Sequence, residues 1–419
     1  MKVAGVVAEY NPFHKGHQYH LEKTRKLTGA DKIVVVMSGD FTQRGTPAII
    51  DKYARTQMAL MCGADLVIEL PSCYACSSAE YFGSGAMAVL ESLGVVDSVC
   101  FGSESGDLSE LVPIAELLAN EPDDFRLYLK NELKNGKSFP RARDLALTHC
   151  IPGFAENEDV TSQPNNILAI EYIKALINMH SRIRPVTLKR TDSDFHSYRL
   201  DQGFASSMAL RQTIRTAEKS TSGFKEVLER IRFQVPPEVY EILYESFGNR
   251  YPVFPNDLSD TLIYKLLIER SHGYKSFVDV GDDLSDKLMN CIYKAHSFEG
   301  FCDVLKSRDL TYARISRVLC HILLNVRQAD MEKYKKGGLI FYNRVLGFRK
   351  DAEDLLSLIS KNTKLPLITR VSEGDILENE TARRQFDRDL LASHIYECLI
   401  ANKFGSGLVN EHERQIIKV

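Results

Sequence analysis

The sequence predicts an α/β protein: a doubly wound parallel sheet in the N-terminal half, followed by a mostly α-helical domain. Three observations lead to this class. Short apolar runs alternate with helical patterns over residues 1–104, strand signals nearly vanish after Gly223, and 419 residues are enough for two domains. Hydrophobic residues make up 44% of the chain and charged residues 26%, as in ordinary globular proteins.

The apolar runs predict strands at residues 2–10, 31–39, 65–71 and 96–104. These runs are apolar almost throughout, which indicates parallel strands buried on both faces. The segments between them have helical spacing, at residues 14–29, 52–64 and 79–94. Because crossovers between parallel strands are right-handed, this order predicts a doubly wound sheet with a ligand site at the carboxyl ends of its strands.

The first domain is expected to end near residue 220. Beyond Gly106, helical spacing covers residues 108–121, 123–136, 165–180 and 208–219, with a polar stretch at 151–164 and a strand at 184–190. After Gly223 the apolar patterns are helical, at residues 224–233, 236–247, 259–270, 286–296, 298–307, 313–326 and 383–402. Residues 364–372 could form one short strand. The predicted domains are therefore 1–220 and 221–419.

The composition excludes several classes of protein. No run approaches the ~18 apolar residues that a membrane-spanning helix needs, and acid and proline come too early at the N-terminus for a signal peptide. We therefore expect a cytoplasmic protein with no membrane partner. The net charge is only −3, so any nucleic-acid binding must come from a local basic patch.

The nine cysteines are scattered along the chain, which does not suggest a disulfide framework. Cys73 and Cys76 form one C-x-x-C motif. A zinc site would need a second pair or nearby histidines, and neither is evident. The pattern favours small buried residues over metal or redox chemistry, and no metal site is predicted.

The sharpest chemical signal is the segment NPFHKGH at residues 11–17, where the first predicted strand meets the first helix. The N-terminus of that helix offers free N–H groups and the positive end of its dipole to a phosphate. His14 and His17 are three residues apart, so both can lie on one face of the opening turn. Two imidazoles there can donate to phosphate oxygens as charge develops. The alternative is a pair of surface histidines beside a turn.

This H-x-G-H segment resembles the HIGH-type motif of the nucleotidyltransferase superfamily, whose members bind ATP or CTP. About 190 residues later, SSMALR at residues 206–211 resembles the helix start that holds a triphosphate in small-molecule nucleotidyltransferases. The resemblance implies a Rossmann-like, nucleotidyltransferase-like first domain with His14 and His17 as catalytic residues. Ser206 or Ser207 can cap a helix, and an arginine such as Arg211 can meet a phosphate bidentately. By itself the second motif is more often only a helix cap.

Longer segments narrow the resemblance to the tRNA(Met) cytidine acetate ligase family. They lie at residues 7–20, 37–71, 101–107, 164–176 and 342–348. The resemblance implies that ATP and acetate form acetyl-adenylate, which acetylates N4 of the wobble cytidine of elongator tRNA(Met) and releases AMP and pyrophosphate. It implies ATP as a substrate accompanied by Mg²⁺, no tightly bound cofactor, and acetate and elongator tRNA(Met) as partners. The sequence gives no oligomeric state.

The family pattern also implies which residues contact ATP. Gly102 could admit the adenine or ribose, Asn165 could bind a ribose or base edge, and Arg190 could meet phosphate. For Asn165 a helix cap and for Arg190 a solvated surface position remain open. The chain departs from the family at Ala169, Thr191 and Ser207-Met208, so Thr191 is more plausible as a backbone contact. The implied ATP-binding residues are Val7, Ala8, Glu9, Tyr10, Asn11, Pro12, Phe13, His14, Lys15, Gly16, His17, Gln18, Tyr19, His20, Gly102, Asn165, Arg190, Thr191, Ser206, Ser207 and Arg211.

A polar segment follows the second predicted strand and lies on the same edge of the sheet as the H-x-G-H motif. We expect it to help hold acetyl-adenylate or the target cytidine, although a solvated loop and helix start would look the same. Its candidate residues are Asp40, Gln43, Arg44 and Lys52.

A basic stretch at residues 308–336 is the best candidate for binding RNA. It contains seven basic and three acidic residues, with Tyr312 and Tyr334 among them and Tyr342, Asn343 and Arg344 soon after. Such a surface could bind tRNA phosphates and stack an unpaired base. An apolar stripe in the same stretch also fits a core helix with solvated ends. The candidate tRNA-binding residues are Arg314, Arg317, Arg327, Lys333, Lys335 and Lys336.

Two other functions remain open from the residues alone. The first is a small-molecule nucleotidyltransferase that makes a nucleotide-activated metabolite and uses its helical half for oligomerisation. The second is a nucleotide-sensing protein that binds without turnover.

Overall fold

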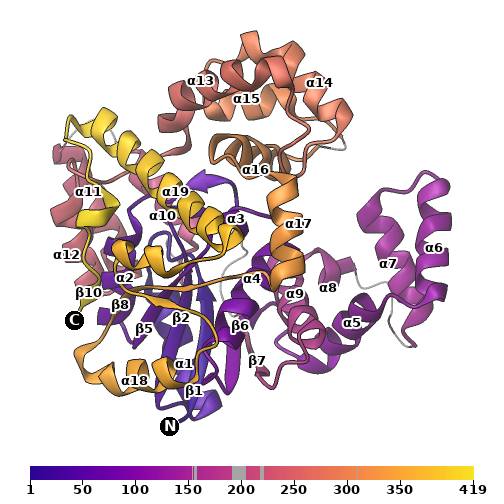
Figure 1. Cartoon of the computed structure of the whole chain (residues 1–419), viewed down its shortest axis with the longest axis horizontal. Coiled ribbons are helices and arrows are strands. Elements are labelled where there is room, and N and C mark those ends of the chain that lie inside the picture. Colours follow the sequence, from indigo (N-terminus) through magenta and orange to yellow (C-terminus); the bar gives the residue numbers. More distant parts are fainter. Residues whose placement is uncertain (153, 155–157, 191–203, 218–220, 309) are drawn as a thin grey trace.

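The computed structural model describes residues 1–152, 154, 158–190, 204–217, 221–308 and 310–419. It confirms the α/β class: one sheet runs through the middle of the molecule with helices against both faces (Figure 1). The strands lie in the order β10-β8-β5-β2-β1-β6-β7. Five parallel strands come from the first half of the chain: β1 (Val3–Ala8), β2 (Lys32–Ser38), β5 (Leu66–Leu70), β6 (Ser98–Ser103) and β7 (Arg184–Lys189).

Alternate residues of the central strands enter two separate hydrophobic clusters, as expected of a sheet covered on both faces. In β2, Val34 and Val36 belong to one cluster, whereas Val35 belongs to the other. The first cluster includes side chains of α3 (Ser72–Ala75), α4 (Ala79–Ser92), α5 (Leu108–Asn120) and α9 (Pro164–Asn178). The second includes side chains of α1 (Lys15–Thr28), α2 (Lys52–Met61), α10 (Ser207–Arg215), α11 (Thr221–Ile231) and α12 (Pro237–Ser246).

The strand order places the reversal of chain direction at β1. From β1 the chain moves outward on one side through β2 and β5, and then returns to pair β6 with the other side of β1. Loops on the two sides of β1 therefore leave in opposite directions and open a crevice at the carboxyl ends of β1 and β6. The H-x-G-H segment lies at that crevice, because α1 starts directly after β1.

The second half of the chain also adds three strands to this sheet among the described residues, and the sequence patterns did not predict two of them. β8 (Asn343–Phe348) runs antiparallel to β5, and β10 (Ile417–Lys418) and β9 (Leu367–Ile368) each run parallel to β8. Only β9 falls within a predicted strand. The domain boundary near residue 220 stays a prediction, but the sheet takes strands from both sides of it.

Helices dominate the rest of the second half, as predicted. α13 to α16 form a cap at the top of Figure 1, and the long α19 lies beside it across the end of the sheet. None of the described helices is long and apolar enough to span a membrane. The remaining helices are α6 (Asp123–Lys134), α7 (Phe139–Cys150), α8 (Glu158–Ser162), α13 (Ser259–Glu269), α14 (Asp282–Cys291), α15 (Phe298–Leu305), α16 (Tyr312–Leu323), α17 (Gln328–Gly337), α18 (Glu353–Asn362) and α19 (Glu380–Phe404).

A small hairpin completes the edge of the sheet that carries the crevice. It consists of β3 (Phe41–Thr42) and β4 (Thr46–Pro47), which pair antiparallel directly after β2. A Cβ added at Gly45, in the turn, would lie 2.5 Å from the backbone of Arg317 in α16, and the residue has a positive φ of 69°. Ser316 Oγ also donates to the carbonyl of Gly45 at 3.1 Å. The hairpin therefore joins the crevice to the helical cap.

Candidate active site

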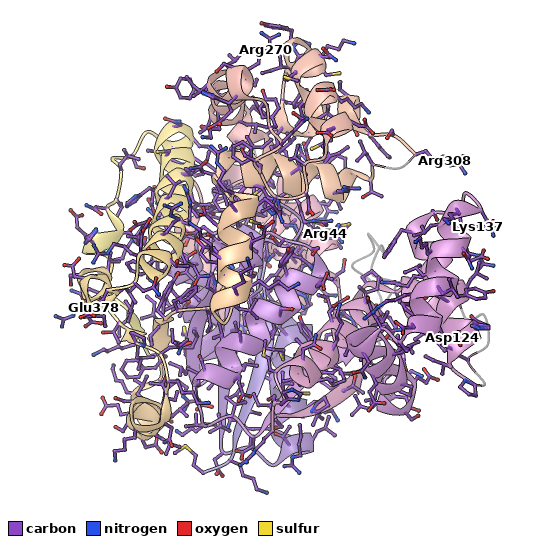
Figure 2. The ribbon with its side chains drawn as sticks, turned by 45° about the vertical axis from the view of Figure 1, so that its right-hand side comes forward. Arg44, Asp124, Lys137, Arg270, Arg308 and Glu378 are labelled. Atoms are coloured by element: carbon purple, nitrogen blue, oxygen red, sulfur yellow. The ribbon has the colours of Figure 1, made fainter. Side chains whose placement is uncertain are left out.

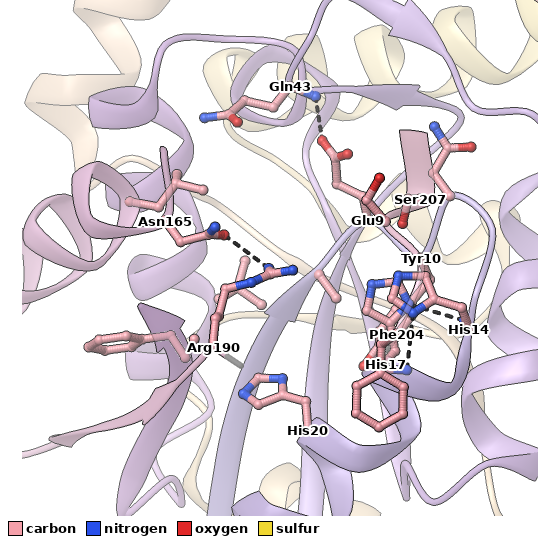
Figure 3. A pocket seen from close by; sticks show the side chains of 18 of the residues that line it. Glu9, Tyr10, His14, His17, His20, Gln43, Asn165, Arg190, Phe204 and Ser207 are labelled. Atoms are coloured by element: carbon pink, nitrogen blue, oxygen red, sulfur yellow. Dashed lines mark hydrogen bonds between the residues drawn. The ribbon is translucent and has the colours of Figure 1, made fainter. Parts of the chain in front are cut away.

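The pocket at the carboxyl ends of β1, β6 and β7 gathers most of the predicted site residues (Figure 3). Its floor comes from the end of β1 and the start of α1. One wall comes from Gly102 of β6 and Arg190 after β7, and the opposite side from Phe204, Ser206 and Arg211 at the start of α10. Segments separated by about 190 residues in the chain therefore form one site.

The two motif histidines stack on each other at the N-terminus of α1. Their ring centroids are 3.7 Å apart with an interplanar angle of 28°. His14 is the N-cap residue, and its Nδ1 accepts a hydrogen bond from Gly16 N at 3.1 Å. His17 Nδ1 accepts one from His14 N at 3.2 Å. A neutral imidazole whose Nδ1 accepts must carry its proton on Nε2, so both residues present an Nε2–H donor.

Electrostatics keep these rings neutral. Burial, aided by the charges of Arg190 and Arg211, lowers the pKa of His14 to about 3. Burial and the neighbouring His14 lower the pKa of His17 well below its usual range. Burial and Arg190 lower the pKa of His20, one turn later, to about 4. At neutral pH the motif thus supplies uncharged, oriented donors whose positions are fixed before any ligand arrives.

A side chain at position 16 would collide with the His14 ring, which explains the glycine there. A Cβ at this position would lie 2.9 Å from His14 Cε1 and 3.0 Å from His14 Nδ1, and 3.4 Å from Phe204 Cβ. The glycine thus lets the cap ring fold back onto the first turn of α1.

Arg211 ties the second motif to the first. Its Nη1 donates to the carbonyl of Asn11 at 2.6 Å, across 200 residues of sequence. Ser206 caps α10 as predicted, since its Oγ accepts from Ala209 N at 3.1 Å. Burial lowers the pKa of Arg211 to about 10, so the guanidinium stays charged at neutral pH. The pocket therefore holds a permanent positive charge next to the two neutral donors.

The opposite wall is built around Glu104, which the sequence analysis did not identify. Its carboxylate accepts from Asn165 N at 3.2 Å, Asn165 Nδ2 at 2.6 Å and Asn166 N at 2.8 Å. It therefore caps the N-terminus of α9, where Gln163 makes no side-chain cap. Asn165 Oδ1 in turn accepts from Arg190 Nη1 at 3.3 Å. Asn165 is thus not itself the cap but a link between Glu104 and Arg190.

Gly102 allows Arg190 to lie across β6. A Cβ there would lie 3.3 Å from Arg190 Cγ and 3.5 Å from Cδ. The small residue therefore makes room for the arginine stem as well as for a ligand in the pocket.

The chain matches the model of the HIGH nucleotidyl transferase family over residues 1–409. Among curated proteins it is 42% identical over 410 residues to the tRNA(Met) cytidine acetate ligase of Thermoanaerobacter sp. (strain X514), covering 97% of this chain and 98% of that one. It is 39% identical over 406 residues to the ligase of the same name from Acetivibrio thermocellus, covering 96% of each. The chain belongs to the tRNA(Met) cytidine acetate ligase family.

Solved structures agree with this family assignment. The apo crystal structure of Thermotoga maritima TmcAL superposes with a TM-score of 0.92 at 33% identity, covering 100% of both chains. A second form of that protein, bound with alpha-thio ATP, gives a TM-score of 0.89 at the same identity and coverage. The resemblance drawn from the sequence motifs is therefore confirmed at the level of the family and the fold.

Most, but not all, of the ligase-family ATP residues reach the pocket. Pro12, Phe13, Lys15 and Gln18 do not line it, and Thr191 lies outside the described residues. Phe13 is fully buried and packs on the His17 ring, with centroids 5.5 Å apart. Apolar lining residues that the motifs gave no reason to single out are Phe82, Phe101, Leu168, Tyr172, Leu188 and Phe204. Each lies in an ordinary apolar pattern, so only the fold brings them to the pocket.

The expected substrate loop divides into two parts. Gln43 and Arg44, in the turn between β3 and β4, line the pocket. Asp40 and Lys52 do not, and their expected contact with substrate is wrong for this structure. Lys52 is fully buried, with Nζ 2.9 Å from Glu69 Oε1 and 2.7 Å from Glu411 Oε1, and Asp40 accepts from its backbone N at 2.8 Å. A buried cation is stable only when it is paired with carboxylates, so the Lys52 ammonium is held by its partners and does not face the pocket.

The predicted basic surface is also divided. Arg314, Lys333, Lys335 and Lys336 are exposed, and Arg317 is half-buried. Arg327 is half-buried and pairs with groups of the protein itself: Nη2 lies 3.1 Å from both Glu269 oxygens, and the guanidinium lies 3.9 Å from the Phe277 ring centroid. We therefore correct Arg327 from an RNA contact to a structural residue.

The aromatic residues near that surface are not available to stack a base, apart from the half-buried Tyr312. Tyr334 and Tyr342 are buried, and Tyr342 donates to Asp389. Asn343 and Arg344 are buried as well, because they belong to β8. The expected stacking surface is therefore wrong for Tyr334 and Tyr342, and Asn343 and Arg344 are not exposed beside it.

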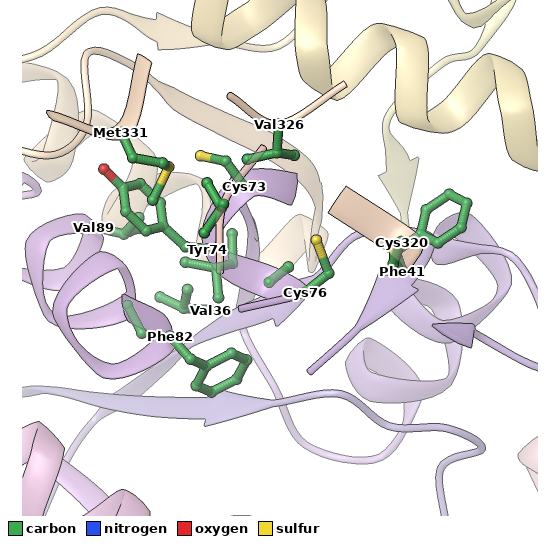
Figure 4. Packing of buried hydrophobic residues seen from close by; sticks show 14 of the residues in the cluster. Val36, Phe41, Cys73, Tyr74, Cys76, Phe82, Val89, Cys320, Val326 and Met331 are labelled. Atoms are coloured by element: carbon green, nitrogen blue, oxygen red, sulfur yellow. The ribbon is translucent and has the colours of Figure 1, made fainter. Parts of the chain in front are cut away.

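The C-x-x-C motif lies in the core, as the pattern favoured. Cys73 lies in α3 and Cys76 is the C-cap residue of that helix, and both pack among apolar side chains between the sheet and α16 (Figure 4). Within the part of the chain that the structure describes, no group of three or more His, Cys, Asp or Glu side chains is placed to hold a metal ion.

Proposed function

We propose that this protein activates acetate with ATP as acetyl-adenylate and transfers the acetyl group to N4 of the wobble cytidine of elongator tRNA(Met). The observation that carries the proposal is the pair of stacked, neutral histidines at the carboxyl end of β1, where the chain reverses direction across the sheet. The chain's membership of the ligase family supports the same reaction. The Thermotoga maritima relative, bound with alpha-thio ATP, supports ATP as the nucleotide.

In the first step an acetate oxygen attacks the α-phosphorus of ATP, and pyrophosphate leaves. Negative charge builds on the phosphate oxygens in the transition state. The Nε2–H groups of His14 and His17 and the guanidinium of Arg211 are placed to stabilise that charge without reorganisation. Mg²⁺ entering with ATP would neutralise the β- and γ-phosphates.

In the second step the exocyclic amine of cytidine attacks the acetyl carbonyl of the adenylate, and AMP leaves. This amine is a weak nucleophile because its lone pair is delocalised into the ring, so an activated acyl donor is needed. The cytidine has to leave its stack to enter the pocket, and holding it beside the adenylate supplies much of the rate. Acetyl-CoA is not needed as an acetyl donor under this mechanism.

The RNA is proposed to approach over the β3–β4 hairpin. Arg44 in that hairpin lines the pocket, and the neighbouring Gly45 contacts the N-terminal part of α16, where Arg314 and Arg317 lie. In Figure 2, Arg44 lies near the centre of the molecule, and the loop at Arg308 and the α6–α7 hairpin, marked by Lys137, both lie to its right. Exposed cations near the pocket mouth suit the phosphates of a stem-loop.

Mass spectrometry of nucleosides tests the function directly. The purified protein is incubated with unmodified tRNA(Met), ATP and acetate, and in parallel with acetyl-CoA and no ATP. We expect N4-acetylcytidine only in the first mixture, together with equimolar AMP and pyrophosphate. Product only with acetyl-CoA would overturn the adenylate mechanism. Stable transfer of a nucleotide to a metabolite would favour a small-molecule nucleotidyltransferase, and binding without turnover a nucleotide sensor.

A further inference from the structure

One carboxylate faces the pocket, and neither motif explains it. Glu9, the first residue after β1, is the only Asp or Glu among the described residues that line the site. A negative group beside the polyphosphate of ATP opposes binding of that ligand. Its presence among the cationic and neutral donors therefore calls for a role in a different step.

Hydrogen bonds hold both the carboxylate and the main chain of Glu9. Its Oε1 accepts from Gln43 N at 2.7 Å, in the turn of the β3–β4 hairpin (Figure 3). Its main-chain carbonyl accepts from Nη1 of the fully buried Arg55 at 2.8 Å. Within the described part of the chain, no hydrogen bond involves its Oε2. One oxygen is therefore held by the protein while the other is left for a ligand.

We propose that Glu9 is the general base that takes the proton from N4 of the cytidine during acetyl transfer; this inference rests on the proposed function. As the N4 nitrogen forms its bond to the acetyl carbon, the carbon–oxygen bond to the phosphate breaks and AMP leaves with the electron pair. The N4 proton moves to Glu9 Oε2 and is later released to water. No oxidant or further co-reactant is needed.

The other groups of the pocket are poorly suited to this task. The acceptor nitrogens of His14 and His17 are already bonded to backbone N–H groups, and their Nε2 atoms carry protons. His20 also lines the pocket, but its Nε2 is buried from solvent. The arginine, lysine and hydroxyl side chains that line the site carry their protons at neutral pH. Glu9 differs from these groups because its Oε2 is an acceptor without a hydrogen bond among the described residues.

The position of Glu9 also suits the second step. Glu9 lines the pocket together with Arg211 and Arg44, and its charge opposes the lowering of the Arg211 pKa by burial. A base that lines the same pocket can reach an amine that attacks the adenylate there. The β3–β4 hairpin binds Glu9 Oε1 through Gln43 N and binds α16 through the Gly45 carbonyl. The hairpin therefore connects Glu9 to the helix that carries Arg314 and Arg317.

Glu9→Gln tests the assignment, because the two steps can be measured separately. Acetate-dependent ATP–pyrophosphate exchange reports the first step, and single-turnover acetylation of tRNA(Met) by supplied acetyl-adenylate reports the second. We expect the second rate to fall by about 10²–10⁴-fold, the usual contribution of a positioned base, and the first to fall far less. The rate of transfer should return in part in Glu9→Asp, which keeps a carboxylate at this position.

Glu22→Gln is the matched control, since it removes the same charge from the exposed face of α1. It should leave both rates at the wild-type level. Transfer by Glu9→Gln at the wild-type rate, or equal losses in both steps, would overturn the role of Glu9 as base while leaving the function intact. A wild-type protein without acetate-dependent exchange would overturn the proposed function itself.

Discussion

At the scale of single residues, the site depends on histidines whose protonation is decided by burial. A free imidazole has a pKa of about 6.5 and is the usual pH switch of a protein. Here burial lowers the pKa of His14 to about 3 and that of His17 well below its usual range. A backbone N–H bonded to each Nδ1 then selects one tautomer. The two residues therefore behave as fixed neutral donors over the whole physiological range.

His14→Ala and His17→Ala should each reduce acetate-dependent ATP–pyrophosphate exchange by about 10²–10³-fold, the usual effect of losing one such donor. Because the folded-state pKa of His14 is depressed, that ring stays neutral as the pH falls from 8 to 5. The wild-type exchange rate should therefore show no midpoint near pH 6.5. Near-normal exchange in both variants, with unchanged thermal midpoints, would remove the pair from the mechanism.

At the scale of secondary-structure elements, the β6–α5 loop organises the start of α9. Glu104 satisfies backbone N–H groups of Asn165 and Asn166 that have no partner within the helix, and it places a negative charge at the positive end of the helix dipole. Through Asn165 it also positions Arg190. One carboxylate therefore serves both the stability of a helix and the shape of the pocket wall.

Glu104→Ala should cost about 1 kcal/mol of unfolding free energy, the typical value of a lost helix cap. It should also raise the KM for ATP, because Asn165 and Arg190 lose their tether, while kcat changes less. Chemical denaturation and steady-state exchange measure the two effects. Glu110→Ala, in the exposed neighbouring turn, is the control and should change neither. An unchanged KM for ATP in Glu104→Ala would show that Asn165 and Arg190, as Glu104 positions them, do not contribute to ATP binding.

At the scale of the whole molecule, distant segments meet in a buried charge cluster at the edge of the sheet. Lys52 from α2, Glu69 from β5, Arg344 from β8 and Glu411 from the C-terminal segment are each at most 5% exposed. Arg344 Nη2 lies 2.8 Å from Glu411 Oε1, and Lys52 Nζ also lies 2.7 Å from it. Glu411 of the C-terminal segment thus neutralises two buried cations, Lys52 of α2 and Arg344 of β8.

Glu411→Gln should destabilise the fold by roughly 3–5 kcal/mol, because it leaves two buried cations with one carboxylate fewer. Burial alone would raise the pKa of Glu411, but Lys52 and Arg344 outweigh it and hold the pKa at about 2. The stabilisation is therefore complete above about pH 4.5 and is lost as the pH falls toward 2. Urea denaturation at several pH values measures this. Asp351→Asn, which breaks an exposed pair with Arg349, should cost at most ~1 kcal/mol.

The RNA surface also belongs to this scale. Replacing Arg314, Lys333, Lys335 and Lys336 with Ala should weaken tRNA(Met) binding and reduce its log–log salt slope by roughly 0.7–0.9 per lost phosphate contact. Acetyl-adenylate formation without tRNA should persist. Arg327→Ala should instead lower stability, because it breaks the contact with Glu269. Unchanged affinity and slope in the fourfold variant would place the RNA elsewhere.

The sequence by itself determined the α/β class, the sheet core of the first half and the two motifs of the pocket. These features are local: apolar runs, helical spacing and H-x-G-H each specify their own element. The tertiary structure alone decided that β8 joins the sheet. Its first two residues, Asn343 and Arg344, are polar, and they can be buried only because Ser92 pairs with Asn343, and Glu69 and Glu411 pair with Arg344. It also decided that Lys52 is a core cation, that Arg327 is a structural residue and that Glu104 caps α9. Each depends on at least one partner more than 50 residues away, and no local pattern encodes such a pairing.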